Sequence, residues 1–256
     1  MQTEHANGNQ IAHESQAKKT LGILQAGRAP EQLLGSVPDY NELFIDLLGQ
    51  DSFHYRTWTV LDNEFPASLE AADAWLITGS RHGVYETHAW IPPLEELIRN
   101  IYSKGDPMVG ICFGHQIIAQ ALGGKVEKYT DGWSAGRVSY TLDPAVWGDG
   151  AIDQTPLMAF HQDQVIEPPE NSTTVGSTPF CRHAALIYDS RILTLQPHPE
   201  FDQPFVEELL KTRGHVLPED ILNEAQQSLD EPIARESIAT TLRHFLDKPA
   251  AQERRN

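Results

Sequence analysis

A cysteine between two glycines is the residue of this chain with the strongest signature of a nucleophile. Cys112 lies in PMVGICFGHQIIAQALGG, where a short apolar run leads through G-x-C-x-G into an amphipathic stretch. This order predicts a strand that turns sharply into a helix, with no room for large neighbours at Gly110 and Gly114. The dipole at the start of the helix favours the thiolate, which is the reactive form of cysteine. We therefore expect Cys112 to be a nucleophile; the alternative is a core cysteine beside two incidental glycines.

A histidine and a glutamate two residues apart provide the other groups that a thiolate nucleophile requires. An imidazole must accept and return the proton, and a third group must orient the imidazole. In LTLQPHPEF, an apolar run leads to His198 at the end of an expected strand, and Glu200 follows Pro199, whose ring fixes φ. The pattern predicts a triad of Cys112, His198 and Glu200. For His198 taken alone, one of eleven histidines, a surface or capping role is the alternative.

A turn that contains glycine is the candidate for the hydrogen-bond donors that amide cleavage requires. In ITGSRHGVYE, a buried run ends near Gly79. The carboxyl ends of parallel strands meet at one edge of a sheet, so N–H groups of this turn and the N–H of Phe113 could converge on one oxyanion. We predict Gly79 and Phe113 as these donors; the alternative for a Gly-Ser pair is a turn without a catalytic role.

The segments that must position these residues alternate between strand and helix patterns. The expected strands are residues 20–27, 53–60, 72–80 and 107–114, and the expected helices are residues 37–49 and 90–105. Such alternation predicts an α/β fold with a mainly parallel sheet flanked by helices. Between residues 136 and 200 the segments become hairpin-like, with Asp189 and Ser190 as a turn, which predicts an antiparallel region as well.

Length and composition predict one catalytic domain. A chain of 256 residues, 40% of them hydrophobic, is long enough for one substantial core. We expect a flexible N-terminal tail over residues 1–18, a single domain over residues 19–246 and a C-terminal tail over residues 247–256. Amphipathic segments between residues 201 and 246 predict C-terminal helices, which could cover the sheet, form a lid or form a dimer interface. The pattern does not predict the oligomeric state.

Net charge and cysteine content restrict the partners and the compartment. The chain has 36 acidic and 19 basic residues, a formal net charge of −17. This charge would repel phosphate backbones and anionic lipid headgroups, so neither nucleic acid nor a membrane is an expected partner. Two cysteines provide no disulfide framework, and neither a signal-peptide core nor an apolar run of bilayer length is found. We expect a cytoplasmic protein.

The motifs GICFGHQ, QPHPE and TGS, in this order, resemble those of the class I (triad) glutamine amidotransferases. The resemblance covers roughly residues 21–201 and is strongest to the stand-alone type, similar to the amidotransferase domain of GMP synthase and to plant γ-glutamyl peptidases. It implies a flavodoxin-like fold, with Cys112 as nucleophile, His198 as base and Glu200 as its orienting partner. It also implies that Gln116 helps hold the substrate and that HQDQV, residues 161–165, lies beside the active site.

The resemblance implies a reaction as well as a fold. The substrate would be glutamine or a small γ-glutamyl compound, which forms a γ-glutamyl thioester on Cys112 while ammonia or an amine departs. Water then releases glutamate, and no metal or organic cofactor is required. One segment, DGWSAGRVSY, has Ser134 and Ala135 where relatives usually carry an acidic residue before the glycine, so substrate preference is left open.

Three other interpretations of the motifs remain open. The chain has no S-G-G-V-D-S-type phosphate loop, so it is not a complete GMP synthase, but it could supply ammonia to a separate synthetase subunit. It could also be a catalytically silent binding or regulatory module that retains the fold. Dienelactone-type α/β-hydrolases also have Cys in G-x-C-x-G, but in them the Asp of the triad precedes a late His in the chain. The adjacent His-Pro-Glu of this chain argues against that class.

Overall fold

The chain, described over residues 17–33, 35–148 and 154–250 in this computed structural model, forms an α/β fold around a nine-stranded sheet. The strands lie in the order β2 (His54–Trp58), β1 (Thr20–Leu24), β3 (Ala74–Ile77), β4 (Met108–Ile111), β11 (Ile192–Leu195), β10 (Ala185–Tyr188), β9 (Ser172–Ser177), β6 (Ser134–Leu142) and β7 (Thr155–His161). From β2 to β11 neighbouring strands are parallel, and from β11 to β7 they are antiparallel. A second, two-stranded antiparallel sheet pairs β5 (Lys125–Lys128) with β8 (Asp163–Glu167). The predicted fold class is confirmed.

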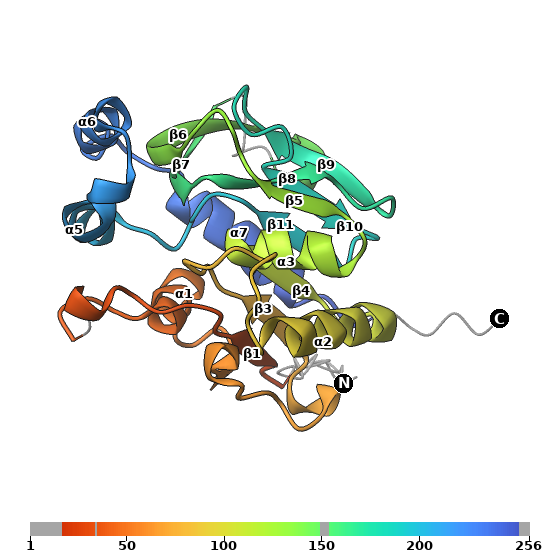
Figure 1. Cartoon of the computed structure of the whole chain (residues 1–256). Helices are drawn as coiled ribbons and strands as arrows, with labels where there is room; N and C mark the ends of the chain where they lie inside the picture. The colour runs from red at the N-terminus through yellow and green to blue at the C-terminus, as the bar shows by residue number, and fades with distance from the viewer. Residues whose placement is uncertain (1–16, 34, 149–153, 251–256) are drawn as a thin grey trace, which may run out of the picture.

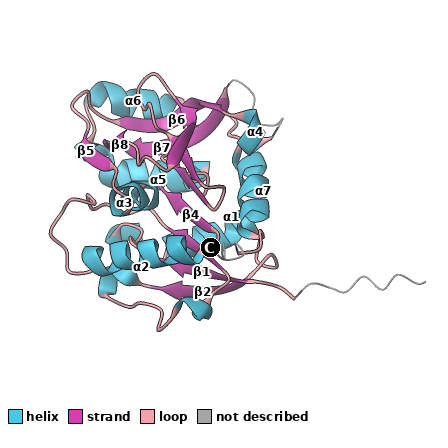
Figure 2. Cartoon of the chain, turned by 90° about the vertical axis from the view of Figure 1, so that its right-hand side faces the viewer, coloured by secondary structure: helices cyan, strands magenta, loops and turns pink. Residues whose placement is uncertain are grey.

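Helices cover both faces of the parallel half of the sheet (Figure 1, Figure 2). Longer helices are α1 (Tyr40–Leu48), α2 (Ile91–Lys104), α3 (Phe113–Ala121), α5 (Gln203–Arg213), α6 (Glu219–Gln227) and α7 (Arg235–Leu246), with a single turn at α4 (Pro144–Trp147). Short 3-10 turns lie at η1 (Glu31–Leu33), η2 (Val60–Asp62), η3 (Leu69–Ala71) and η4 (Gly214–Val216). Buried residues of α1 and α7 form one core cluster with the sheet, and those of α2 and α3 form a second on the opposite face.

Local signals explain where the first helices begin and end. Asp39 and Glu42 form a capping box at the start of α1, in which the Asp39 N–H donates to Oε2 of Glu42 at 2.8 Å. Gly49 ends α1 at φ 87°, and Gly105 ends α2 at φ 81°, which is backbone that glycine adopts at little cost. Both helices therefore lie where helical spacing and terminal glycines predicted them.

The antiparallel half begins with the hairpin of β10 and β11. Asp189 and Ser190 form its two-residue loop with φ values of 45° and 58°. Two positive φ values in succession are the signature of a type I′ turn, whose twist matches that of paired strands. The predicted turn is confirmed. Because β11 is also parallel to β4, this hairpin joins the two halves of the sheet and carries the segment that contains His198 to the same edge as Cys112.

The C-terminal helices pack in two different places. Helix α7 packs on the sheet, whereas α5 and α6 form a separate cluster with other residues, including Met158 on the edge strand β7 and Phe201 in the segment after β11. The first described strand begins at Thr20 and the last helix ends at Leu246, next to the predicted limits of the domain, and the single-domain organisation stays a prediction. Residues 1–16 and 251–256 of the predicted tails lie outside the described residues.

None of the helices in the described part of the chain combines the length and the apolar character needed to cross a bilayer.

Candidate active site

Cys112 lies at a strained turn between β4 and α3. Its backbone has φ 52° and ψ −102°, a conformation that costs a residue with a side chain about 1–3 kcal/mol. The backbone N–H of Cys112 donates to the carbonyl of Leu195 at 2.8 Å, which fixes the turn to the end of β11. The predicted sharp strand-to-helix turn is present, and it presents the sulfur at the start of α3.

The two glycines beside Cys112 are required by close backbone contacts. A Cβ at Gly114 would lie 2.3 Å from the carbonyl oxygen of Ile77 on β3, and one at Gly110 would lie 2.6 Å from the carbonyl oxygen of Gly114. Neither backbone atom can move without displacing its own strand or helix. The spacing G-x-C-x-G therefore follows from how tightly α3 approaches β3 and β4.

His198 and Glu200 form a buried hydrogen-bonded pair next to Cys112. Nδ1 of His198 lies 2.7 Å from Oε1 of Glu200, and the two residues are 4% and 1% exposed. The N–H of His198 donates to the carbonyl of Met158 at 2.8 Å, which anchors the segment after β11 to β7. The segment after β11 and strand β7, which are distant in sequence, thus both hold the imidazole. The structure brings together the three residues of the predicted triad.

Charge distinguishes the two cysteines of the chain. Burial opposes protonation of His198, but the Glu200 carboxylate and the Cys112 sulfur outweigh it and raise the pKa of His198. A cationic imidazole beside a sulfur favours the thiolate. Cys181 is also buried, and burial raises the pKa of its thiol to about 12, so it stays a neutral thiol. Cys112 as the reactive sulfur stays a prediction, with which this arrangement agrees.

Two aromatic residues that the sequence analysis did not single out complete the surroundings of His198. The ring of Phe201 stacks on the imidazole with centroids 4.0 Å apart and planes 2° apart, which restricts rotation of the ring. Tyr40, at the start of α1, packs near Phe201 with centroids 6.1 Å apart. Phe201 follows the His-Pro-Glu motif directly, so its position is a signal that sequence inspection could have used; Tyr40 carries no such signal.

The two predicted oxyanion donors lie around the sulfur. A Cβ at Gly79 would lie 3.0 Å from Cε1 of His198 and 3.8 Å from Cβ of Cys112, so the turn after β3 faces the reactive pair directly. Phe113 is the first residue of α3, where a backbone N–H has no acceptor within its own helix. Convergence of these two N–H groups on one substrate oxygen stays a prediction.

Gln116 and the segment HQDQV lie on another side of Cys112. The side-chain nitrogen of Gln116 donates to the carbonyl of Asp163 and to Oε1 of Gln196, both at 3.0 Å, which leaves the Gln116 side-chain oxygen for a ligand. Nδ1 of His161 lies 3.2 Å from the carbonyl of Asp163, whereas Nε2 is buried without a partner among the described residues. Gln116, His161 and Asp163 all line the cavity above Cys112. The predicted substrate role of Gln116 stays a prediction.

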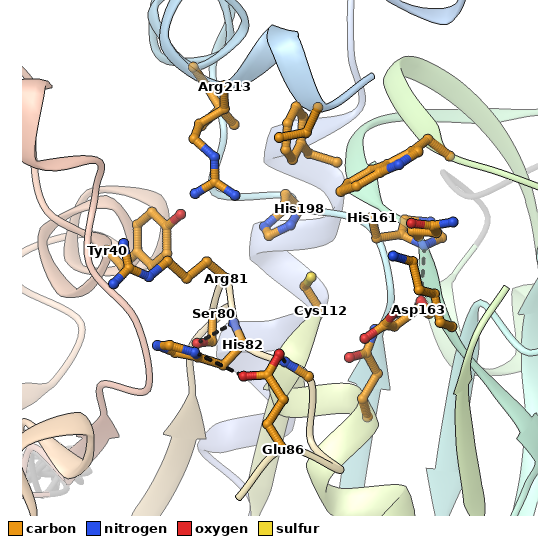
Figure 3. A pocket seen from close by; sticks show the side chains of 18 of the residues that line it. Tyr40, Ser80, Arg81, His82, Glu86, Cys112, His161, Asp163, His198 and Arg213 are labelled. Atoms are coloured by element: carbon orange, nitrogen blue, oxygen red, sulfur yellow. Dashed lines mark hydrogen bonds and ion pairs between the residues drawn. The ribbon is translucent and has the colours of Figure 1, made fainter. Parts of the chain in front are cut away.

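A cavity of about 280 Å³ opens above Cys112 and His198 (Figure 3). Its walls come from the loop after β3, from the ends of β6 and β7, and from α5 and η4. This volume is of the size of a small-molecule site rather than of a protein groove. The C-terminal helices thus form part of the cavity wall as well as packing on the fold.

A group of possible metal ligands lies at the rim of this cavity. Oε2 of Glu86 lies 3.2 Å from Nδ1 of His82 and 2.7 Å from Nε2 of His88, and the three ligand atoms lie within 4.8 Å of one another. Two imidazoles and a carboxylate could hold a divalent ion such as zinc. The Glu86 carboxylate also accepts from the N–H of Gly83 at 3.0 Å, so the same contacts tie the loop together through hydrogen bonds alone.

Comparison with known proteins decides the family. Residues 48–212, which include every predicted site residue, match the family model described as glutamine amidotransferase class-I. The chain belongs to the class I glutamine amidotransferase family. The resemblance stated from the motifs is therefore confirmed.

Relatives and solved structures agree with this membership. Gamma-glutamyl peptidase 2 of Arabidopsis thaliana is 29% identical over 199 residues, 74% of this chain and 80% of that protein. The GMP synthase of Tolumonas auensis is 26% identical over 194 residues, 68% of this chain and 36% of that protein. The structure of a glutamine amidotransferase from Thermotoga maritima has a TM-score of 0.71 at 18% identity, covering 90% of this chain and 98% of that chain. The last comparison confirms the fold of the chain.

Buried neutral histidines near the site predict a loss of stability in acid. Burial lowers the pKa of His115 to about 3 and that of His161 to about 3, from an ordinary value of 6.5. The unfolded chain therefore binds more protons than the folded chain between these pH values, and stability falls as pH decreases from about 6.5 toward 3. The expected slope is about 1.4 kcal/mol per pH unit for each histidine.

Denaturant unfolding at pH 7, 5.5 and 4.5 measures this slope. His115→Asn, which keeps a polar atom near Oγ1 of Thr194, the present partner of Nδ1 at 2.8 Å, is expected to have a shallower pH dependence than the wild type. An unchanged slope in this variant would mean that His115 does not cause the acid sensitivity.

Proposed function

We propose that this chain hydrolyses the side-chain amide of glutamine, or the γ-amide of a small γ-glutamyl compound, through a thioester on Cys112. The observation that carries the proposal is the strained turn of Cys112 beside the buried pair of His198 and Glu200, at the base of a cavity. Relatives named as γ-glutamyl peptidase and as glutamine-hydrolyzing GMP synthase support the same type of bond as substrate.

In the first half-reaction, Sγ of Cys112 attacks the γ-carbonyl carbon while His198 holds the thiol proton. The oxyanion that forms accepts hydrogen bonds from the N–H groups of Gly79 and Phe113. When the C–N bond breaks, His198 gives its proton to the departing nitrogen, so that ammonia or an amine leaves and the acyl group stays on sulfur. Glu200 keeps Nδ1 of His198 protonated and stabilises the imidazolium throughout.

In the second half-reaction, a water molecule attacks the thioester carbon. His198 accepts a proton from this water and returns it to the sulfur as the C–S bond breaks, which releases glutamate and restores the thiol. Both cysteines of the chain are free thiols, which supports the reducing cytoplasm as the compartment for this chemistry.

The test is release of ammonia and glutamate from glutamine, and of glutamate from a panel of γ-glutamyl amides and peptides. The purified chain is expected to release product from at least one compound, and the Cys112→Ala protein serves as the blank. Silence on every compound would contradict a self-sufficient hydrolase, and would favour a subunit that supplies ammonia to a separate synthetase or a module without activity.

A further inference from the structure

An arginine extends into the cavity from the C-terminal helices. Arg213 is the last residue of α5, and its guanidinium points toward Tyr40 and His198 (Figure 3). Among the described residues it forms neither a hydrogen bond nor an ion pair, although acidic residues outnumber basic ones by 36 to 19. A guanidinium is always charged and carries five donors, so a half-buried one without a partner suits an anionic ligand.

The charge of Arg213 acts on Tyr40, which lies beside the triad. Burial raises the pKa of Tyr40, the Cys112 and Glu200 charges raise it further, and the Arg213 charge offsets part of this rise. Tyr40 therefore lies within the electrostatic reach of both the triad and Arg213. An anion bound by Arg213 would lie within the same cavity as the reacting sulfur.

The position of Arg213 relative to Cys112 indicates which part of a substrate it meets. His198 must protonate the departing nitrogen, so the leaving group has to lie on the side of His198. Arg213 lies on that side, whereas Asp163, whose carbonyl holds Gln116, lies on the opposite side of Cys112 (Figure 3). Arg213 therefore faces the leaving group rather than the glutamyl part.

Apolar side chains surround the same part of the cavity. Phe201 from the segment after β11, Leu209 from α5 and Val216 from η4 line it together with Arg213. Trp133 and Phe160 add an aromatic pair, with ring centroids 5.6 Å apart. Departing ammonia would use neither an apolar wall nor a cation, since it is small and carries no negative charge.

Given the proposed function, on which this step depends, we infer that the leaving group is an amino acid or short peptide with a free carboxylate and an apolar side chain. The carboxylate binds the guanidinium of Arg213, and the side chain packs against Phe201, Leu209 and Val216. Substrates of this class are γ-glutamyl peptides. The bond that breaks is the γ-amide, and the products are glutamate and the amino acid or peptide.

The test compares γ-glutamylphenylalanine with its C-terminal amide, which lacks only the carboxylate charge. Binding of each compound to the Cys112→Ala protein is measured by calorimetry, and kcat/KM for each is measured on the wild type. The affinity and kcat/KM for the acid are expected to exceed those for the amide by about tenfold or more, because only the acid can form a charge-assisted contact with Arg213. Arg213→Met is expected to bring the ratio of acid to amide close to one, mainly by lowering the affinity and kcat/KM for the acid.

Lys211→Met is the matched control, because it removes a positive charge from the same helix turn. The Lys211 ammonium bonds Glu208 at 2.6 Å and does not line the cavity, so the preference for the acid is expected to persist. The inference is wrong if the Cys112→Ala protein, which retains Arg213, binds the acid and the amide equally or binds neither of them. This outcome requires no Arg213 variant. If the acid binds better than the amide but neither compound shows Cys112-dependent turnover, only the proposed hydrolysis is contradicted.

Discussion

The Cys112→Ala protein is expected to lose at least about 10⁴-fold of kcat on every γ-glutamyl substrate while staying folded. In the proposed mechanism the thioester forms on the sulfur of Cys112, whereas the neighbouring His198 and Glu200 only move or orient the proton. Alanine keeps the strained φ of 52° and fills most of the space of cysteine, so the free energy of unfolding should change by about 1 kcal/mol or less. Single-turnover kinetics and denaturant unfolding measure the two quantities.

Cys181→Ala is the matched control for this prediction. Cys181 is 2% exposed, and burial raises the pKa of its thiol to about 12, so the variant should retain full turnover. Iodoacetamide followed by peptide mass analysis provides a second measurement, in which Cys112 is alkylated rapidly and Cys181 is not. Retained turnover in Cys112→Ala, or preferential labelling of Cys181, would remove Cys112 from the role of nucleophile.

Much of the site could be predicted because its signals are local in the sequence. The turn at Cys112 depends on Gly110 and Gly114, whose lack of a side chain is visible in the sequence and is explained by contacts of 2.6 and 2.3 Å. The hairpin turn at Asp189 and Ser190 follows in the same way from its two residues. In such cases one short segment contains both the pattern and its physical cause.

Other parts could not be predicted because they depend on contacts between distant segments. Tyr40 and Arg213 are far apart in the chain, and neither lies in a motif, yet both line the cavity above Cys112. The amphipathic pattern of residues 204–214 predicted a helix but could not distinguish packing on the sheet from a place in the cavity wall. The sheet order β11, β10, β9, β6 and β7 likewise results from pairing across loops whose lengths carry no such information.

Glu200→Gln is expected to lower kcat by about 10²- to 10⁴-fold, a smaller loss than for Cys112→Ala or His198→Ala. The glutamine amide can still accept a hydrogen bond from Nδ1 of His198, now 2.7 Å from the carboxylate, but it no longer supplies the charge that raises the pKa of His198. The imidazolium that accompanies the thiolate therefore becomes less favourable. The pH profile of kcat/KM should shift accordingly, with the His198 pKa at a lower value in the variant.

Stability separates this catalytic role of Glu200 from a structural one. Glu200 is 1% exposed, and its Oε2 has no partner among the described residues, so the folded chain carries an incompletely compensated charge. Because that charge also favours protonated His198 in the folded chain, a neutral amide should lower the free energy of unfolding at neutral pH, by up to about 3–5 kcal/mol, while the variant stays folded. Turnover that falls only in proportion to the folded fraction would indicate that Glu200 mainly supports the fold, and a loss equal to that of Cys112→Ala would give it a larger part in the chemistry than orienting His198.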